Sequence, residues 1–144
     1  MIRKLKSNDL GQLLEDSVVG ACLKRECTHF RLHTIRSFKG VSNPCDFIVL
    51  EKSYTALLEC KATGDDKFSC SGFTQLPHFE KTVLHSHVGI YGVIVYFYCE
   101  NPMFVFATDK KVIENKQKRR PIRVSDKNSY DLIFDNIDDL LDGL

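Results

Sequence analysis

The sequence lacks a run of apolar residues long enough to cross a membrane, and it contains no tryptophan. A membrane-spanning helix needs about 20 consecutive apolar residues. The longest apolar run, Gly89 to Cys99, is shorter and has the Val, Ile, Tyr and Phe content of a β-strand. No apolar segment follows the basic N-terminus MIRKLKSNDL, as it would in a secretory signal. We therefore expect an intracellular protein that does not contact a membrane.

The sequence also lacks a Cys-x-x-Cys pair, although it contains six cysteines. That spacing is common in zinc and redox sites, and its absence fits reduced, structural cysteines in the cell interior. One group of side chains supplies four zinc-type ligands, but its spacing matches no common zinc motif: Cys22, Cys27, His29 and His33. We favour structural cysteines and keep zinc binding as the alternative.

The sequence also has nearly equal numbers of basic and acidic residues, with a net charge of +1. The distribution is nevertheless uneven. Residues 110–123 carry seven basic side chains and one acid, whereas the chain from Asp126 onward carries six aspartates and one lysine. So dense a basic stretch suits a polyanion such as DNA, and a solvated helix end is the plainer alternative. The predicted DNA contacts are Lys116, Lys118, Arg119 and Arg120.

No repeat, low-complexity segment or Pro/Gly-rich linker divides the chain, so residues 1–144 are expected to form one domain. Helical spacing and capping residues predict helices at 7–26, 74–87, 110–117 and 136–141. We expect Ser7 or Asn8 to cap the first of these and Asp109 the third. Apolar runs predict strands at 29–37, 46–50, 54–61, 89–98, 103–107 and 120–124, with 63–72 as a loop. This order predicts an α/β fold with a mixed central sheet flanked by helices.

The segment TALLECKAT (55–63) carries two charges within an otherwise apolar strand. Strand side chains alternate between faces, so Glu59 and Lys61 point in the same direction. On an exposed edge strand they would form an ordinary charge pair. In a central strand, burying them costs free energy unless another interaction compensates.

A third charged residue, Asp46, opens the preceding strand, and the predicted hairpin brings it beside Glu59 with Lys61 close by. Two carboxylates at one point are the minimum oxygen site for Mg²⁺, which takes substrate phosphate oxygens and water as its other ligands. A neighbouring lysine can position or deprotonate the water that attacks phosphorus. The three residues therefore predict metal-assisted hydrolysis of a phosphodiester.

The arrangement Pro44-x-Asp46, twelve residues, Glu59-x-Lys61 resembles the PD-(D/E)xK nuclease superfamily. Within it, most of the chain resembles the RecU-type Holliday junction resolvases. Two further segments carry this likeness: GQLLE (11–15), which matches the family's first helix, and SGFTQLPHFEKT (71–82), in which a glutamine opens the next helix.

The resemblance implies a restriction-endonuclease-like core and a Mg²⁺-dependent homodimer, with Mn²⁺ as a substitute metal. It places Glu15 with Asp46 and Glu59 as the acids near the metal, and Gln75 beside the active site. Members of the family cut paired strands across a four-way DNA junction in recombination and repair. The expected location is the cytoplasm of a bacterium or of a phage-infected host.

Thirty residues separate Glu15 from Asp46, so the projecting stalk of cellular resolvases is short or missing, which suits a compact, phage-encoded member. Three alternatives stay open: an endonuclease for linear duplex DNA, a DNA-binding relative without activity, and a zinc-binding interaction domain. His78, His85 and His87 are interpreted as surface or capping residues, with contact to the DNA backbone as the alternative.

Overall fold

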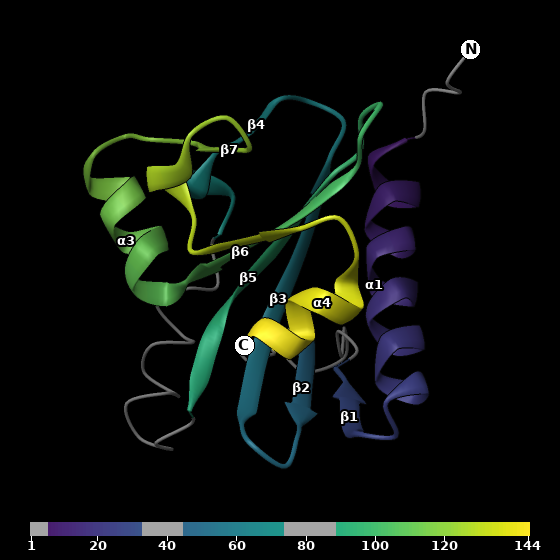
Figure 1. Cartoon of the computed structure of the whole chain (residues 1–144). Helices are drawn as coiled ribbons and strands as arrows, with labels where there is room; N and C mark the ends of the chain where they lie inside the picture. Colours follow the sequence, from purple (N-terminus) through teal and green to yellow (C-terminus); the bar gives the residue numbers. More distant parts are fainter. Residues whose placement is uncertain (1–5, 33–44, 74–88) are drawn as a thin grey trace, which may run out of the picture.

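The computed structural model describes residues 6–32, 45–73 and 89–144, and it has a central sheet with helices on both faces (Figure 1). The strand order in this six-stranded sheet is β1-β2-β3-β5-β6-β8. Strands β3 and β5 pair in parallel, and the other neighbours pair antiparallel. Its strands are β1 (Thr28–Arg31), β2 (Phe47–Leu50), β3 (Thr55–Thr63), β5 (Ile90–Phe97), β6 (Met103–Thr108) and β8 (Leu132–Phe134).

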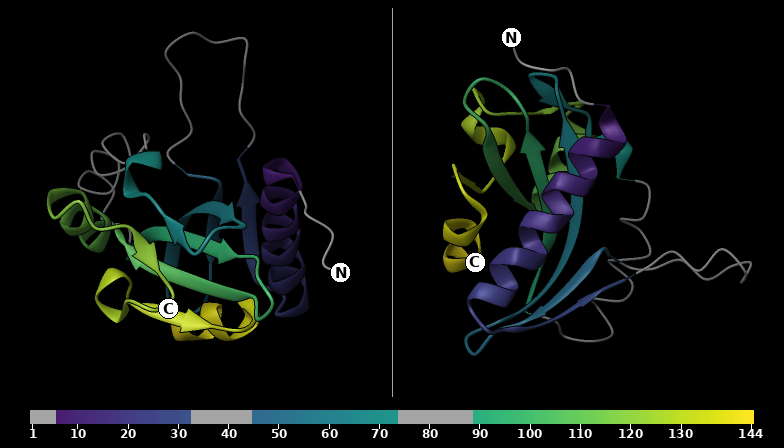
Figure 2. Two further views of the ribbon diagram at one scale, coloured as in Figure 1. Left: turned by 90° about the horizontal axis from the view of Figure 1, so that it is seen from above. Right: turned by 90° about the vertical axis from the view of Figure 1, so that its right-hand side faces the viewer.

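Two groups of elements cover the two faces of this sheet (Figures 1 and 2). One face packs against the helices α1 (Ser7–Lys24) and α4 (Ile137–Gly143). The other face packs against the helix α3 (Asp109–Gln117) and the 3-10 turn η1 (Cys70–Gly72). A small antiparallel sheet of β4 (Lys67–Phe68) and β7 (Ile122–Arg123) joins the second layer, followed by the 3-10 turn η2 (Lys127–Ser129).

The central strands bury apolar side chains on both faces, which explains why their sequences are apolar throughout. Leu58 of β3 packs with Leu14 and Val18 of α1 in one core. Its neighbour Leu57 packs with Val112 of α3 in the other core. The predicted mixed sheet flanked by helices is therefore confirmed, and so are the central position of β5 and the hairpin of β2 and β3.

The caps predicted for the first and third helices are wrong, by one or two residues at the first helix and by one residue at the third. Helix α1 begins at Ser7, because Lys6 already has the extended N-cap conformation and its carbonyl accepts from Asp9 and Leu10. Helix α3 begins at Asp109, and its cap is Thr108, whose hydroxyl accepts from the Lys111 N–H at 3.3 Å. Neighbouring polar residues can each serve as a cap, and the backbone dihedral angles decide which of them does.

The predicted loop over 63–72 is also wrong, because β3 continues to Thr63 and the segment then forms β4 and η1. Strand β4 pairs with β7, so its structure depends on a partner from a distant part of the sequence. Strand β8 was not predicted, and it forms by pairing with β6 at the edge of the sheet. The predicted helix over 74–87 lies outside the described residues, as do positions 33–37 of the first predicted strand.

None of the helices in the described ranges is both long and apolar enough to span a membrane.

We expect Gly92→Ala to lower the free energy of unfolding by about 1–3 kcal/mol, the usual cost of overpacking. Gly92 lies in β5, where an added Cβ would be 2.5 Å from the Ala107 carbonyl oxygen and 2.7 Å from the Phe106 ring. Gly20→Ala is the control, because a Cβ on this exposed face of α1 meets nothing within 4 Å. It should stabilise the helix by up to about 1 kcal/mol. Urea unfolding measures both, and equal stabilities would contradict the packing described for Gly92.

Candidate active site

The hairpin of β2 and β3 brings Asp46 and Glu59 to adjacent positions. Phe47 pairs with Leu58, and the Asp46 N–H donates to the Leu58 carbonyl at 3.0 Å. Continuing this register by one residue places Asp46 opposite Glu59, on the same face of the sheet. The Cys60 N–H donates to Asp46 Oδ2 at 2.7 Å and thereby fixes the orientation of this carboxylate.

Glu59 and Lys61 lie on a central strand, since β3 is flanked by β2 and β5. The edge-strand alternative is therefore wrong. Glu59 is only 3 % exposed, whereas the side chain of Lys61 is 38 % exposed. The Lys61 Nζ lies 3.6 Å from Glu59 Oε1. A buried carboxyl group thus has one partly exposed ammonium beside it, on the side from which solvent can enter.

The electrostatic surroundings of Glu59 oppose its ionisation. Burial raises the pKa of Glu59, and the nearby Asp46 carboxylate acts in the same direction, while the charges of Lys61 and Lys116 lower it. The Glu59 Oε2 atom is buried and has no hydrogen-bond partner among the described residues. A buried oxygen without a partner costs free energy, and the described residues supply no positive group that would complete the site.

A divalent cation fits this arrangement. It would give Oε2 a partner and favour the ionised form of Glu59, and Asp46 supplies a second carboxylate at the adjacent position. Within the described ranges no group of three or more Asp, Glu, His or Cys side chains is close enough to hold a metal ion. Mg²⁺ tolerates such a small protein contribution, because it retains waters and binds substrate phosphate oxygens.

Another predicted acid, Glu15, is not joined to this pair. Glu15 on α1 forms an ion pair with Arg31 of β1. Its charge nevertheless acts on Cys60 of β3: burial raises the pKa of the Cys60 thiol, and the carboxylates of Asp46, Glu15 and Glu59 raise it further. Gln75, like the three histidines of the same segment, lies outside the described residues. Their roles stay predictions.

The zinc alternative receives no support from the part of the chain that the structure describes. Cys22 is buried in the core beneath α1, and burial together with the Cys27 thiol raises the pKa of Cys22 to about 12. Cys22, Cys27 and His29 do not form a metal-ligating group, and His33 lies outside the described ranges.

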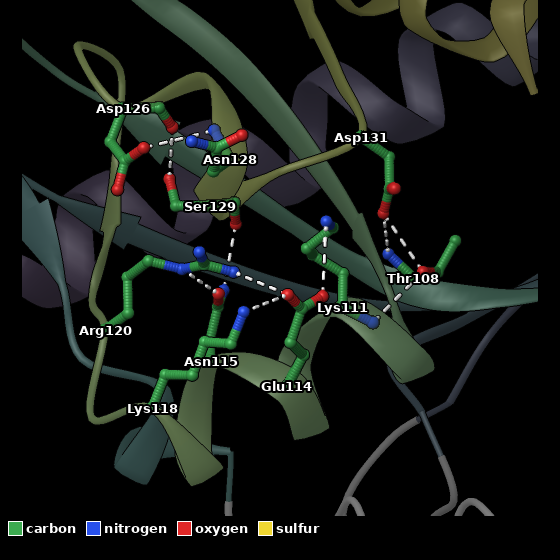
Figure 3. A network of polar contacts seen from close by, with 10 residues as sticks. All are labelled: Thr108, Lys111, Glu114, Asn115, Lys118, Arg120, Asp126, Asn128, Ser129 and Asp131. Carbon is green, nitrogen blue, oxygen red and sulfur yellow. Dashed lines mark hydrogen bonds and ion pairs between the residues drawn. The ribbon is translucent and has the colours of Figure 1, made fainter.

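The basic segment divides into two kinds of side chain. Figure 3 shows Lys118 and Arg120, which follow α3, converging on Glu114 of that helix, with Lys111 as a third cation. The Lys118 Nζ lies 3.0 Å from Glu114 Oε1, and Arg120 Nη2 lies 3.3 Å from the same atom. Hydrogen bonds from Lys118 and Lys111 lower the pKa of Glu114 to about 2, so this acid stays charged at neutral pH.

The other two predicted DNA contacts have no carboxylate partner among the described residues. Arg119 forms no ion pair there, and it follows α3 with a positive φ of 51°. The Lys116 Nζ donates to the Phe73 carbonyl at 3.1 Å, and its charge reaches Glu59. Sequence reasoning missed this proximity of α3 to β3, since no local pattern signals a contact between these segments.

Comparisons with known proteins support the fold. No protein-family model matches the sequence, and no curated protein matches it. Among solved structures, Hjc, a Holliday junction resolvase from the hyperthermophilic archaeon Archaeoglobus fulgidus, matches with a TM-score of 0.57 and 15% identity. The match covers 90% of this chain and 98% of that chain. The chain therefore shares its fold with this protein, a mixed sheet flanked by helices as the sequence predicted. The nuclease role and the finer likeness to RecU-type enzymes are left as proposals.

Glu59→Gln should raise the free energy of unfolding at pH 7 when no divalent cation is present. The folded-state pKa of Glu59 lies above the ordinary value of 4.5, so its ionisation destabilises the folded protein above that pH. The advantage of the variant should shrink as the pH falls through the folded-state pKa toward 4.5. Urea unfolding between pH 4 and 8 measures it, and a pH-independent difference would contradict this assignment.

The same variant tests the metal site without an activity assay. Mg²⁺ at 100 times its dissociation constant should stabilise the wild-type protein by about 2.7 kcal/mol, because the ion binds only the folded state. Glu59→Gln should lose this stabilisation. Asp65→Asn, in an exposed turn, should keep it. Equal Mg²⁺ shifts in all three proteins would contradict a site at Glu59.

Proposed function

We propose that this protein is a Mg²⁺-dependent, structure-selective DNA endonuclease that resolves four-way junctions by hydrolysis of phosphodiester bonds. One observation supports this proposal above the others. The buried oxygen of Glu59 lacks a partner and lies next to Asp46 and Lys61, on a fold shared with a Holliday junction resolvase. The shared fold favours junction DNA, and the three side chains supply the groups that the chemistry needs.

Each residue has a distinct proposed role. Asp46 and Glu59 would hold the metal ion, with Asp46 oriented by the Cys60 N–H. When bound, Mg²⁺ would polarise the scissile phosphate and neutralise its charge. Lys61, partly exposed beside Glu59, would position the attacking water and stabilise negative charge on phosphorus. Glu15 stays a proposed third acid, and it would have to exchange Arg31 for the metal site.

The proposed substrate constrains the assembly. Resolving a four-way junction requires two nicks, placed symmetrically about the branch point. One site of Asp46, Glu59 and Lys61 makes one nick. We therefore propose a two-fold homodimer that carries two such sites. A compact relative of the RecU-type resolvases would meet this requirement without a long stalk between Glu15 and Asp46.

Asp46→Asn and Glu59→Gln should each abolish cleavage of a labelled four-way junction while DNA binding is retained or becomes tighter. Each change removes a metal ligand and also a negative charge that repels phosphate. Lys61→Ala should be equally inactive yet keep its Mg²⁺ stabilisation, because an ammonium group is not a ligand. Lys52→Ala, in the exposed turn at the other end of the hairpin, is the control. Turnover in either acid variant would refute the proposed site.

The protein should be a dimer in solution and should bind four-way DNA more tightly than linear duplex of the same length. Light scattering gives its mass alone and on DNA, and cleavage is compared on four-way, flap and linear substrates. A monomer in both states that cuts linear and branched DNA equally would instead identify an endonuclease for linear duplex. DNA binding without cleavage of any substrate would identify an inactive relative.

A further inference from the structure

A pocket of about 640 Å³ opens between η1 and the C-terminal end of α3. Pairing of β4 with β7 holds its two walls together, because Lys67 pairs with Arg123 and Phe68 pairs with Ile122. The pocket contains cations and hydroxyl groups from both walls. No carboxylate occurs in its described lining, whose polar residues include Lys67, Ser69, Ser71, Lys116, Arg119 and Arg120.

The donors in this pocket are available for an anion. Ser69 and Ser71 are exposed, and their hydroxyl oxygens lie 2.8 Å apart, so one hydroxyl donates to the other and the pair retains one hydrogen to donate. Arg120 Nη2 is buried and makes no hydrogen bond, although it lies within ion-pair distance of Glu114. Arg119 forms no ion pair with any described residue. Glu114 already neutralises Arg120, whereas the other groups provide donors and positive charge without a carboxylate partner among the described residues.

The pocket adjoins the candidate active site. Cys70 lines it and packs in the same core as Leu57, whose side chain lies on the same face of β3 as Glu59. Lys116 also lies in its wall and donates to the carbonyl of Phe73. A nucleic-acid strand whose scissile phosphate lies at Asp46 and Glu59 can therefore place another phosphate in the pocket. The volume falls within the range that small-molecule sites use, so a phosphate fits together with its attached sugar.

We propose that this pocket, called the phosphate pocket below, binds one backbone phosphate of the DNA strand that is cut at Asp46 and Glu59. The inference rests on the proposed function for the identity of that strand. It also separates the basic segment into two roles. Lys116 and Arg119 contact the phosphate together with Lys67, whereas the charge of Lys118 is directed to Glu114. The sequence predicted four separate phosphate contacts in the basic segment, whereas this proposal has several side chains binding a single phosphate.

The first experiment measures DNA affinity against salt concentration, by fluorescence anisotropy in EDTA so that no cleavage occurs. Lys67→Ala, Lys116→Ala and Arg119→Ala should each weaken binding and make the slope of log affinity against log salt shallower by at most about 0.9, the value for one phosphate. The triple variant should also lose only about 0.9 in slope, because all three side chains contact the same phosphate. Retained thermal stability in each variant excludes misfolding as the cause.

The comparison variants lie in α3 or directly after it. Lys118→Ala should change the slope less than Arg119→Ala, because its partner Glu114 already neutralises it. Lys110→Ala removes an exposed cation from the first turn of α3, outside the pocket, and controls for the loss of one charge. A triple-variant loss near 2.7, as three separate contacts would give, would overturn the proposal. An equal effect of Lys118→Ala would overturn it too.

The second experiment neutralises single phosphates of the cut strand with methylphosphonate groups. At one position the substitution should weaken binding of the wild-type protein, have a smaller effect on Arg119→Ala, and have no further effect on the triple variant. Additive effects at every position would overturn the proposal. Inorganic phosphate is the alternative ligand, and its binding is measured as thermal stabilisation of the folded protein. If Arg119→Ala abolishes this stabilisation but leaves DNA affinity unchanged, the pocket binds free phosphate and the DNA proposal is wrong.

Failure of the proposed function is distinguishable from failure of this inference. Coupling between Arg119 and one phosphate, found in a protein that cleaves no DNA, would refute the nuclease activity and leave a DNA-binding pocket. Cleavage that depends on Asp46 and Glu59, with no such coupling, would refute the pocket and leave the nuclease. Absence of DNA binding would refute both.

Discussion

The burial of Glu59 within the central strand is the constraint on which the rest of the site depends. An ionisable group at 3 % exposure is costly unless a positive group compensates, and Lys61 at 3.6 Å compensates only one of its two oxygens. The antiparallel partner β2 adds a second carboxylate, Asp46, rather than a cation. The proposed metal ion would resolve this conflict, since two carboxylates that repel each other would become ligands of the same ion.

The parallel pairing of β3 with β5 has consequences for the second face of the sheet. Parallel neighbours require a long connection, and the chain between these two strands contributes β4 and η1 to the layer that α3 occupies. The connection thereby reaches the basic segment after α3. The same topology that leaves Glu59 in a central strand also positions the phosphate pocket beside it, so the two proposed sites depend on one architectural feature.

Glu114 determines how the positive charge of α3 is distributed. It attracts Lys111, Lys118 and Arg120, and Arg120 in turn donates to Asn115, whose amide donates to the Ser129 carbonyl (Figure 3). This network fixes the turn that follows the helix. Lys116 and Arg119 line the pocket and are not paired with Glu114. Glu114 thus separates the cations of this segment into those that it binds and those that are available to an anion.

The sequence by itself determined the features that depend on local periodicity. Alternation within β3 puts Glu59 and Lys61 on one face, and a short turn places Asp46 opposite, because both effects act over a few residues. Only the tertiary structure decided that β4 pairs with β7, that β8 closes the edge, and that Lys116 lies near Glu59. These contacts join segments far apart in the chain. Their formation depends on which apolar faces pack together, and no local pattern of residues encodes that choice.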